Sequence, residues 1–152
     1  MTRQKTRPVR RLVLVLGDQL DSRSAVFDGF DRDRDVVWMA EVAEESTHVW
    51  THKARIATFL AAMRHFRDDL RRRGITVDYR QLDDRGNKGS LGEELKAAVR
   101  RLKPESLVVV EPGEWRVKQS LVLTAEDLGV PLDTRDDRHF LCSHEEFAEH
   151  IR

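Results

Sequence analysis

An unbroken apolar run close to the start of the chain, residues 12–16, is followed at once by Gly17, Asp18, Gln19 and Leu20. A run this short and this rich in valine and leucine is typical of a strand that is buried on both faces of a parallel sheet. The polar residues after it then lie at the carboxyl end of the strand. Ligands bind at this edge in open α/β sheets, so the segment predicts both a fold class and the place of a ligand site.

Strands and helices are predicted to alternate along the rest of the chain. Strand-like apolar runs follow at 36–40, 75–82, 107–110 and 130–133, and Pro131 marks the last of them as an edge strand. Helices are predicted over 53–73 and 91–102, then up to Leu128, and finally after Ser143. This order predicts a Rossmann-like α/β fold, a doubly wound, mainly parallel sheet of five strands with helices on both faces, in a single domain.

The predicted topology also places the crevice of the sheet. If the strand order reverses after the third strand, the first and fourth strands lie side by side at a switch point. Residues 17–19 and 111–115 would then frame the crevice, where a doubly wound fold binds its ligand.

Charge and cysteine content exclude several classes of protein. The 152 residues include 27 basic and 27 acidic side chains, so bulk charge gives no reason to expect nucleic-acid or membrane binding. The single cysteine, Cys142, rules out a disulfide within the chain and a cysteine-ligated iron–sulfur cluster. No apolar stretch approaches the ~18 residues of a membrane span. No secretory signal is recognised either, and we expect a cytoplasmic protein.

Arginine and lysine dominate the first eleven residues. We expect residues 1–11 to be a disordered, solvated arm that precedes a domain over residues 12–152. An arm that binds nucleic acid is the alternative interpretation of these charges.

The familiar catalytic and cofactor motifs are missing. Gly17 is not followed by the second glycine of a dinucleotide fingerprint, and the chain has neither a phosphate loop nor a Gly-x-Ser-x-Gly elbow. His48 and His52 have the spacing of neighbours on one helix face, but they do not form a His-Glu-x-x-His motif. We therefore assign no catalytic residue and no metal site.

Acidic side chains gather at the predicted strand ends: Asp18, Glu41, Glu45, Asp83, Asp84, Glu111 and Glu114. Such carboxylates can perform acid–base chemistry, accept hydrogen bonds from a neutral ligand, or simply cap helices. For Asp18 and Gln19, which come directly after a buried strand, we favour contact with a ligand.

Several short motifs together resemble the N-terminal domain of the photolyase/cryptochrome superfamily. They are Leu-Gly-Asp-Gln-Leu at 16–20, Glu-Val at 41–42 with Glu45, His-Lys at 52–53, Ala-Met-Arg-His-Phe at 62–66, Asp-Asp at 83–84, Glu-Pro-Gly-Glu-Trp-Arg-Val at 111–117 and Phe-Leu-Cys-Ser-His at 140–144. Within the superfamily, the set is most similar to the prokaryotic photolyase-related branch of iron–sulfur bacterial cryptochromes and (6-4) photolyases. The resemblance extends over nearly the whole chain.

The resemblance implies an antenna domain. In that branch this domain holds a light-harvesting chromophore, typically 6,7-dimethyl-8-ribityllumazine, which passes excitation to a flavin. The FAD, the 4Fe–4S cluster and the DNA lesion bind to a separate C-terminal helical domain. The resemblance thus implies that this chain alone is not catalytic and does not bind DNA directly. It is expected to be a fragment of a longer protein or a stand-alone antenna module.

The resemblance also implies which residues bind the chromophore. They are Gly17, Asp18, Gln19 and Leu20 after the first strand, Glu41, Val42, Glu45 and His48 after the second, and His52 and Ile56 on the following helix. The polar members are expected to hydrogen-bond the ring edge or the ribityl chain, and Val42 and Ile56 to sandwich the ring. His48 stands where relatives often carry tyrosine.

Residues 111–117 allow two interpretations, contact with the ligand or a structural turn in which Trp115 faces the helical domain. The second predicts an exposed apolar patch and self-association through it. Two other functions stay open at this stage. One is a small enzyme that acts on a nucleotide or another phosphorylated substrate through the strand-end carboxylates. The other is a non-catalytic interaction domain.

Overall fold

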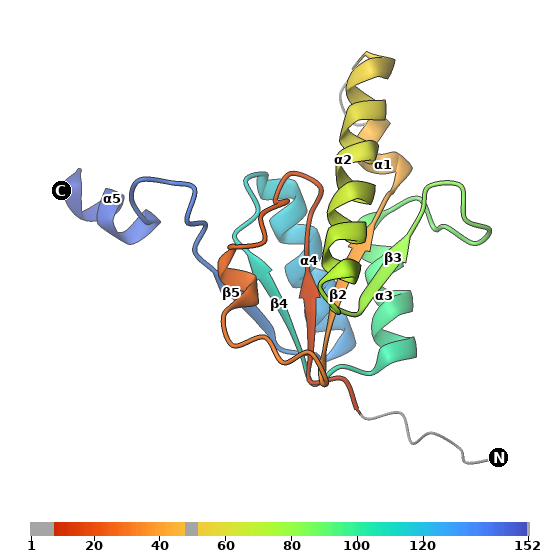
Figure 1. Cartoon of the computed structure of the whole chain (residues 1–152). Helices are drawn as coiled ribbons and strands as arrows, with labels where there is room; N and C mark the ends of the chain where they lie inside the picture. The colour runs from red at the N-terminus through yellow and green to blue at the C-terminus, as the bar shows by residue number, and fades with distance from the viewer. Residues whose placement is uncertain (1–7, 48–51, 152) are drawn as a thin grey trace.

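The computed structural model describes residues 8–47 and 52–151 and contains a five-stranded sheet in which all strands are parallel (Figure 1). The strands are β1 (Arg11–Leu14), β2 (Asp35–Ala40), β3 (Val77–Arg80), β4 (Ser106–Val110) and β5 (Leu132–Arg135). Their order in the sheet is β3-β2-β1-β4-β5. The order reverses after β3, which is the condition under which the sequence analysis placed the first and fourth strands side by side, and β1 and β4 are neighbours at this switch point.

The described part of the chain also contains five α-helices and one short 3-10 helix; all but the last helix lie between strands. They are η1 (Ala25–Phe27), α1 (Ala43–Thr47), α2 (Lys53–Arg72), α3 (Leu91–Leu102), α4 (Trp115–Leu128) and α5 (His144–His150). The four predicted helices are all present, whereas η1 and α1 were not predicted. The α/β fold class with a single domain is confirmed.

The two faces of the sheet carry separate apolar layers. Leu12 and Leu14 of β1 are fully buried and belong to the layer under α3 and α4. Val13 and Val15 point to the opposite face and belong to the layer under α2 and η1. Successive side chains of a strand alternate between faces, so a run that is apolar at every position requires cover on both sides.

The carboxyl ends of the strands meet the start of α2. Figure 1 shows that α2 begins well beyond this edge of the sheet and runs back across one face. Its first half therefore stands over the strand ends, and its second half packs on the sheet through Met63 and Leu70. The strand ends are thus partly roofed by a helix.

The end of the predicted basic arm belongs to the domain. Arg11 is the first residue of β1, and the Arg10 guanidinium donates to both carboxylate oxygens of the buried Asp35, at 2.8 and 2.6 Å. Burial alone would raise the pKa of Asp35, but the hydrogen bonds from Arg10 and from the Asp31 N–H outweigh it and lower the pKa. Residues 1–7 lie outside the described residues, so the rest of the predicted arm stays a prediction.

The chain after β5 runs away from the sheet and ends in α5 (Figure 1). None of the residues of α5 is buried, and Phe140, Leu141, Phe147 and Ile151 are exposed in this segment. Trp115 at the start of α4 is also 69% exposed. Exposed aliphatic and tryptophan side chains were predicted for this domain. In the described ranges, none of the helices is long and apolar enough to cross a membrane.

Candidate functional site

A cavity of about 320 Å³ opens at the carboxyl edge of the sheet, beside the switch point. The ends of β1 and β2, the first half of α2 and the start of α4 enclose it. It is lined by Val15, Leu16, Gly17, Asp18, Ala40, Glu41, Val42, Glu45, Arg55, Ile56, Phe59, Leu60, Met63, Leu91, Pro112, Gly113, Glu114 and Val117. Its size is at the lower end of the range for small-molecule sites in proteins.

Six of the residues that the sequence analysis expects to bind a chromophore line this cavity: Gly17, Asp18, Glu41, Val42, Glu45 and Ile56. Asp18 and Gly17 lie there because the chain turns directly after β1 at the sheet edge.

Three other predicted residues have different surroundings. The Gln19 amide donates to the carbonyls of Val110 and Glu111, at 3.3 and 3.2 Å, and so ties the end of β1 to the end of β4. Leu20 packs against the apolar layer under α2. His52 is the N-cap of α2, where its Nδ1 accepts from the Ala54 N–H at 3.1 Å. His48 lies outside the described residues.

Gly17 allows α2 to approach the end of β1 very closely. A Cβ atom at this position would lie 2.3 Å from Cζ of Phe59 and 2.9 Å from Sδ of Met63. Such distances are far inside van der Waals contact, so any larger residue displaces the Phe59 ring. Phe59 is 37% exposed, and its ring forms the part of the cavity wall that is nearest to Gly17.

Glu41 is a buried carboxylate whose oxygens are fully engaged. Oε1 accepts from Nε of Arg64 and from the Tyr79 hydroxyl, at 2.7 and 2.6 Å, and Oε2 accepts from Arg64 and from the Leu82 N–H, both at 2.9 Å. Burial alone would raise the pKa of Glu41, but these hydrogen bonds outweigh it and hold the pKa below its ordinary value. Burial, followed by the bond to Glu41, raises the pKa of Tyr79. Through these hydrogen bonds Glu41, which directly follows β2, is joined to α2 by Arg64 and to β3 by Tyr79.

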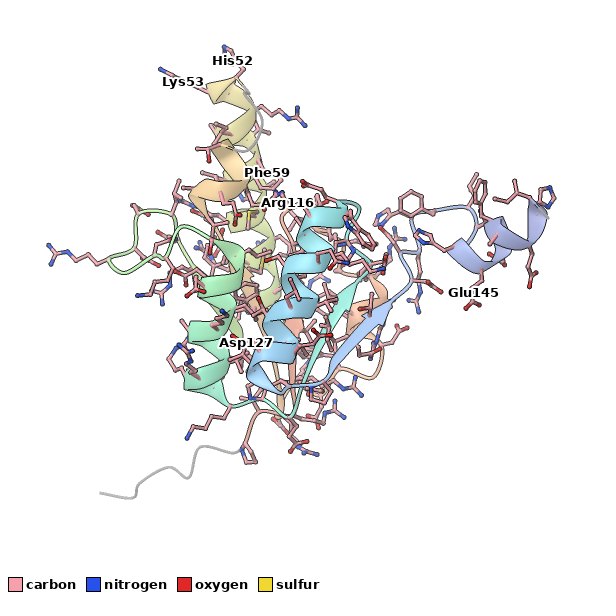
Figure 2. All side chains as sticks on the ribbon, turned by 180° about the vertical axis from the view of Figure 1, so that it is seen from behind. His52, Lys53, Phe59, Arg116, Asp127 and Glu145 are labelled. Atoms are coloured by element: carbon pink, nitrogen blue, oxygen red, sulfur yellow. The ribbon has the colours of Figure 1, made fainter. Side chains whose placement is uncertain are left out.

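Arg116 connects two acidic segments beside the cavity, which are Glu44 and Glu45 of α1 and Glu114 at the start of α4. Its guanidinium lies 3.4 Å from Glu44, 3.5 Å from Glu45 and 3.0 Å from Glu114. Figure 2 shows Arg116 at the same end of the molecule as Phe59, while His52 lies out at the tip of α2. Burial raises the pKa of Glu45, with the neighbouring carboxylates Glu114 and Glu44 adding to the shift and Arg116 opposing it.

Sequence reasoning missed the part of the wall that α2 supplies after Ile56. Phe59, Leu60 and Met63 follow Ile56 at helical spacing, so the apolar stripe of α2 already contained the signal. Of this helix, only His52 and Ile56 were predicted to contact the ligand. Because α2 starts beyond the sheet edge, its first half has no strand beneath it and faces the cavity instead.

The lining combines an apolar interior with carboxylates at the rim. Such a site can enclose a planar ring between aliphatic and aromatic side chains while its carboxylates accept hydrogen bonds from N–H and O–H groups. Over residues 8–47 and 52–151, no group of three or more His, Cys, Asp or Glu side chains could hold a metal ion. The geometry is thus suited to a small molecule that carries both an apolar surface and hydrogen-bond donors.

A doubly wound α/β domain with a ligand-sized cavity at its switch point is the class of protein that the fold and the site define. Residues 13–152 match the family described as deoxyribodipyrimidine photo-lyase-related protein, and the chain belongs to this family. It is also 44% identical over 137 residues to a (6-4) photolyase of Agrobacterium fabrum (strain C58 / ATCC 33970). That match covers 90% of this chain but 27% of the relative, so the chain spans about a quarter of the relative's length.

Proposed function

We propose that this chain is the light-harvesting domain of a photolyase- or cryptochrome-like protein, and that the cavity holds an antenna chromophore of the 6,7-dimethyl-8-ribityllumazine type. The observation that carries the proposal is the position of the cavity, which lies at the switch point of a chain from the photolyase-related family. This is the place where a doubly wound sheet binds its ligand.

The chemistry of the lining supports a neutral ring with a polyol chain. Val42, Ile56 and Phe59 offer apolar surfaces for the two faces of the ring. Asp18 and Glu45 line the cavity, and in this proposal their carboxylates accept hydrogen bonds from the ribityl hydroxyls or from a ring N–H. A lumazine supplies all of these donors without a charged group.

The redox and repair chemistry is proposed to belong to another domain of the whole protein. Four cysteines are needed to hold a 4Fe–4S cluster, and this chain has only Cys142, which is exposed. In this proposal FAD, the cluster and the DNA lesion bind to a helical domain, and this chain passes excitation to the flavin. Its own residues bind and orient the chromophore and carry out no bond-breaking step.

Titration of the purified chain with 6,7-dimethyl-8-ribityllumazine tests the proposal. We expect saturable binding of one equivalent, followed by visible absorption and by fluorescence anisotropy of the ligand. Phe59→Ala removes an aromatic wall and is expected to weaken binding by roughly tenfold. Phe147→Ala is the matched control, because Phe147 is exposed on α5, away from the cavity lining. The proposal is wrong if neither the lumazine nor riboflavin nor a folate binds at tens of micromolar.

A further inference from the structure

The start of α4 is the place where a phosphate group would be expected in this fold. The N-terminal end of a helix that faces the switch point carries free N–H groups and positive dipole charge, which attract phosphate. α4 is the helix that begins after β4 at the cavity, and Glu114 is its N-cap residue. Glu114 also lines the cavity. A carboxylate therefore already lies beside the anion-attracting end of this helix.

The arginine beside that helix end is matched by several carboxylates. Arg116 lies within 3.5 Å of Glu44, Glu45 and Glu114, one of which is the N-cap residue itself. Arg116 is thus already engaged by three carboxylates. A phosphate that approached Arg116 would have to displace these partners and would be repelled by them.

The other residues that line the cavity do not make the positive charges more numerous than the negative ones. Asp18, Glu41, Glu45 and Glu114 line the cavity, and Arg55 is the one cationic side chain on the lining in the described part of the chain. The negative charge of Glu41 is neutralised by its ion pair with Arg64. With Arg64, Arg116 and Glu44 included, the carboxylates around the cavity still outnumber the arginines by five to three.

We propose that this cavity takes the unphosphorylated form of its ligand and excludes the phosphorylated form, and that Glu45 and Glu114 with Arg116 are the groups that set this choice. The inference rests on the proposed function, since it concerns the ligand of the same cavity. It adds a criterion of selection: a ribityl compound enters with a free terminal hydroxyl, and its 5′-phosphate ester is rejected. The phosphorylated substrates of the rival enzyme hypothesis would be rejected on the same ground.

A pair of ligands that differ only in the phosphate tests this inference. We expect 6,7-dimethyl-8-ribityllumazine to bind at least about fivefold more tightly than its 5′-phosphate ester at low salt. The ratio is expected to fall toward one as ionic strength rises, because salt screens the repulsion but does not alter the apolar contacts.

Equal affinities at low salt would overturn the inference and leave the proposed function intact. Tighter binding of the ester would overturn the inference in favour of a phosphate-binding site. Failure of both ligands to bind would overturn the inference, and it would overturn the proposed function as well if riboflavin and a folate also failed to bind.

The variant Glu45→Gln/Glu114→Gln assigns the effect to the named residues. It removes two negative charges and releases Arg116 from two of its partners, so the affinity ratio is expected to drop to about two or less. The ratio is the readout because any common loss of affinity cancels from it. Glu126→Gln is the matched control: Glu126 is exposed and lies roughly three turns further along α4. A ratio that is unchanged in the double variant would show that these carboxylates do not set the choice.

Discussion

Gly17 is the residue on which the shape of the cavity depends most directly. In Gly17→Ala the new methyl group would overlap the Phe59 ring and the Met63 sulfur, so the ring must move away from its place on the cavity wall. We expect the dissociation constant for the lumazine to rise by roughly tenfold and the unfolding free energy to fall by about 1 kcal/mol. Ligand titration and urea unfolding measure the two effects.

Gly113 provides a matched control for this substitution. It also lines the cavity, but a Cβ atom there would meet no other atom within 4 Å. Gly113→Ala is therefore expected to leave both quantities nearly unchanged. Similar losses in the two variants would show that the close approach of Phe59 to Gly17 has no special role.

Glu41 is expected to stabilise the fold rather than bind the ligand through its carboxylate. Glu41→Gln replaces a carboxylate that accepts four hydrogen bonds and leaves Arg64 without its negative partner. We expect the unfolding free energy at neutral pH to fall by about 2–3 kcal/mol. Glu145→Gln, at an exposed position of α5, is the control and is expected to change it by less than about 0.5 kcal/mol.

The pH dependence of the same variant gives a second test. The pKa of Glu41 is lower in the folded chain than its ordinary value of 4.5, so the unfolded chain binds the proton first as the solution becomes acidic. The stability that this carboxylate contributes is fully present above that ordinary value and is lost as the pH falls through the folded pKa. The difference between the wild-type chain and Glu41→Gln should therefore shrink in acid. A difference that stays constant from neutral to acidic pH would contradict this role.

The residues directly after β1 illustrate what sequence could predict at this scale. The position of Gly17 and Asp18 at the cavity follows from a buried run that ends in polar residues. The different position of Gln19 depends on the turn after Leu16, in which the Gln19 N–H bonds to the Leu16 carbonyl at 3.0 Å and the side chain is directed to β4. That direction is set by a neighbour 91 residues away, which a local pattern does not contain.

At the scale of elements, long periodic segments were predicted best. The 20-residue α2 and the 12-residue α3 have clear apolar stripes, and both were predicted to within about one residue. The five-residue α1 is too short for a stripe, and its place between β2 and residues 48–51 gave no periodic signal. β5 begins two residues later than predicted, although the Pro131 carbonyl just before it already accepts a hydrogen bond from the Leu107 N–H of β4.

Two helices with the same kind of N-cap should respond differently to its loss. Ser90 caps α3 and Ser143 caps α5, each by accepting a backbone N–H bond with its hydroxyl. α3 buries Leu91, Leu95 and Val99, so Ser90→Ala is expected to lower the global unfolding free energy by about 1 kcal/mol. α5 buries no residue, so Ser143→Ala should reduce only the local protection of α5 amides in hydrogen exchange. If both variants lost the same amount of global unfolding free energy, this would show that α5 unfolds together with the sheet.

At the scale of the whole molecule, alternation of strands and helices was sufficient to predict the parallel α/β fold, and it allowed the strand order that places β1 beside β4. A run apolar at every position needs cover on both faces, and short connections leave few orders of parallel strands. The path of residues 136–151 was not predictable in the same way. Its exposed apolar side chains have no partner layer in the sheet, and a sequence pattern cannot show which surface covers them.

These exposed side chains lead to a prediction about association. Phe140, Leu141 and Phe147 lie on one short segment outside the domain core, with exposed fractions of 67%, 107% and 59%. Contact between such segments of two chains removes apolar surface from water, so we expect the chain to self-associate with rising concentration. Sedimentation velocity measures this directly.

The triple variant Phe140→Ser/Leu141→Ser/Phe147→Ser is expected to stay monomeric over the same concentration range. Its fold should be retained, because none of the three side chains is buried in the sheet layers, and urea unfolding checks this. Leu123→Ser is the control, since Leu123 is 60% exposed on α4 within the domain. Association that persists in the triple variant but disappears with Leu123→Ser would assign the contact to α4. A wild-type chain that remains monomeric at its solubility limit would contradict the prediction, because apolar side chains this exposed would then have no effect on association.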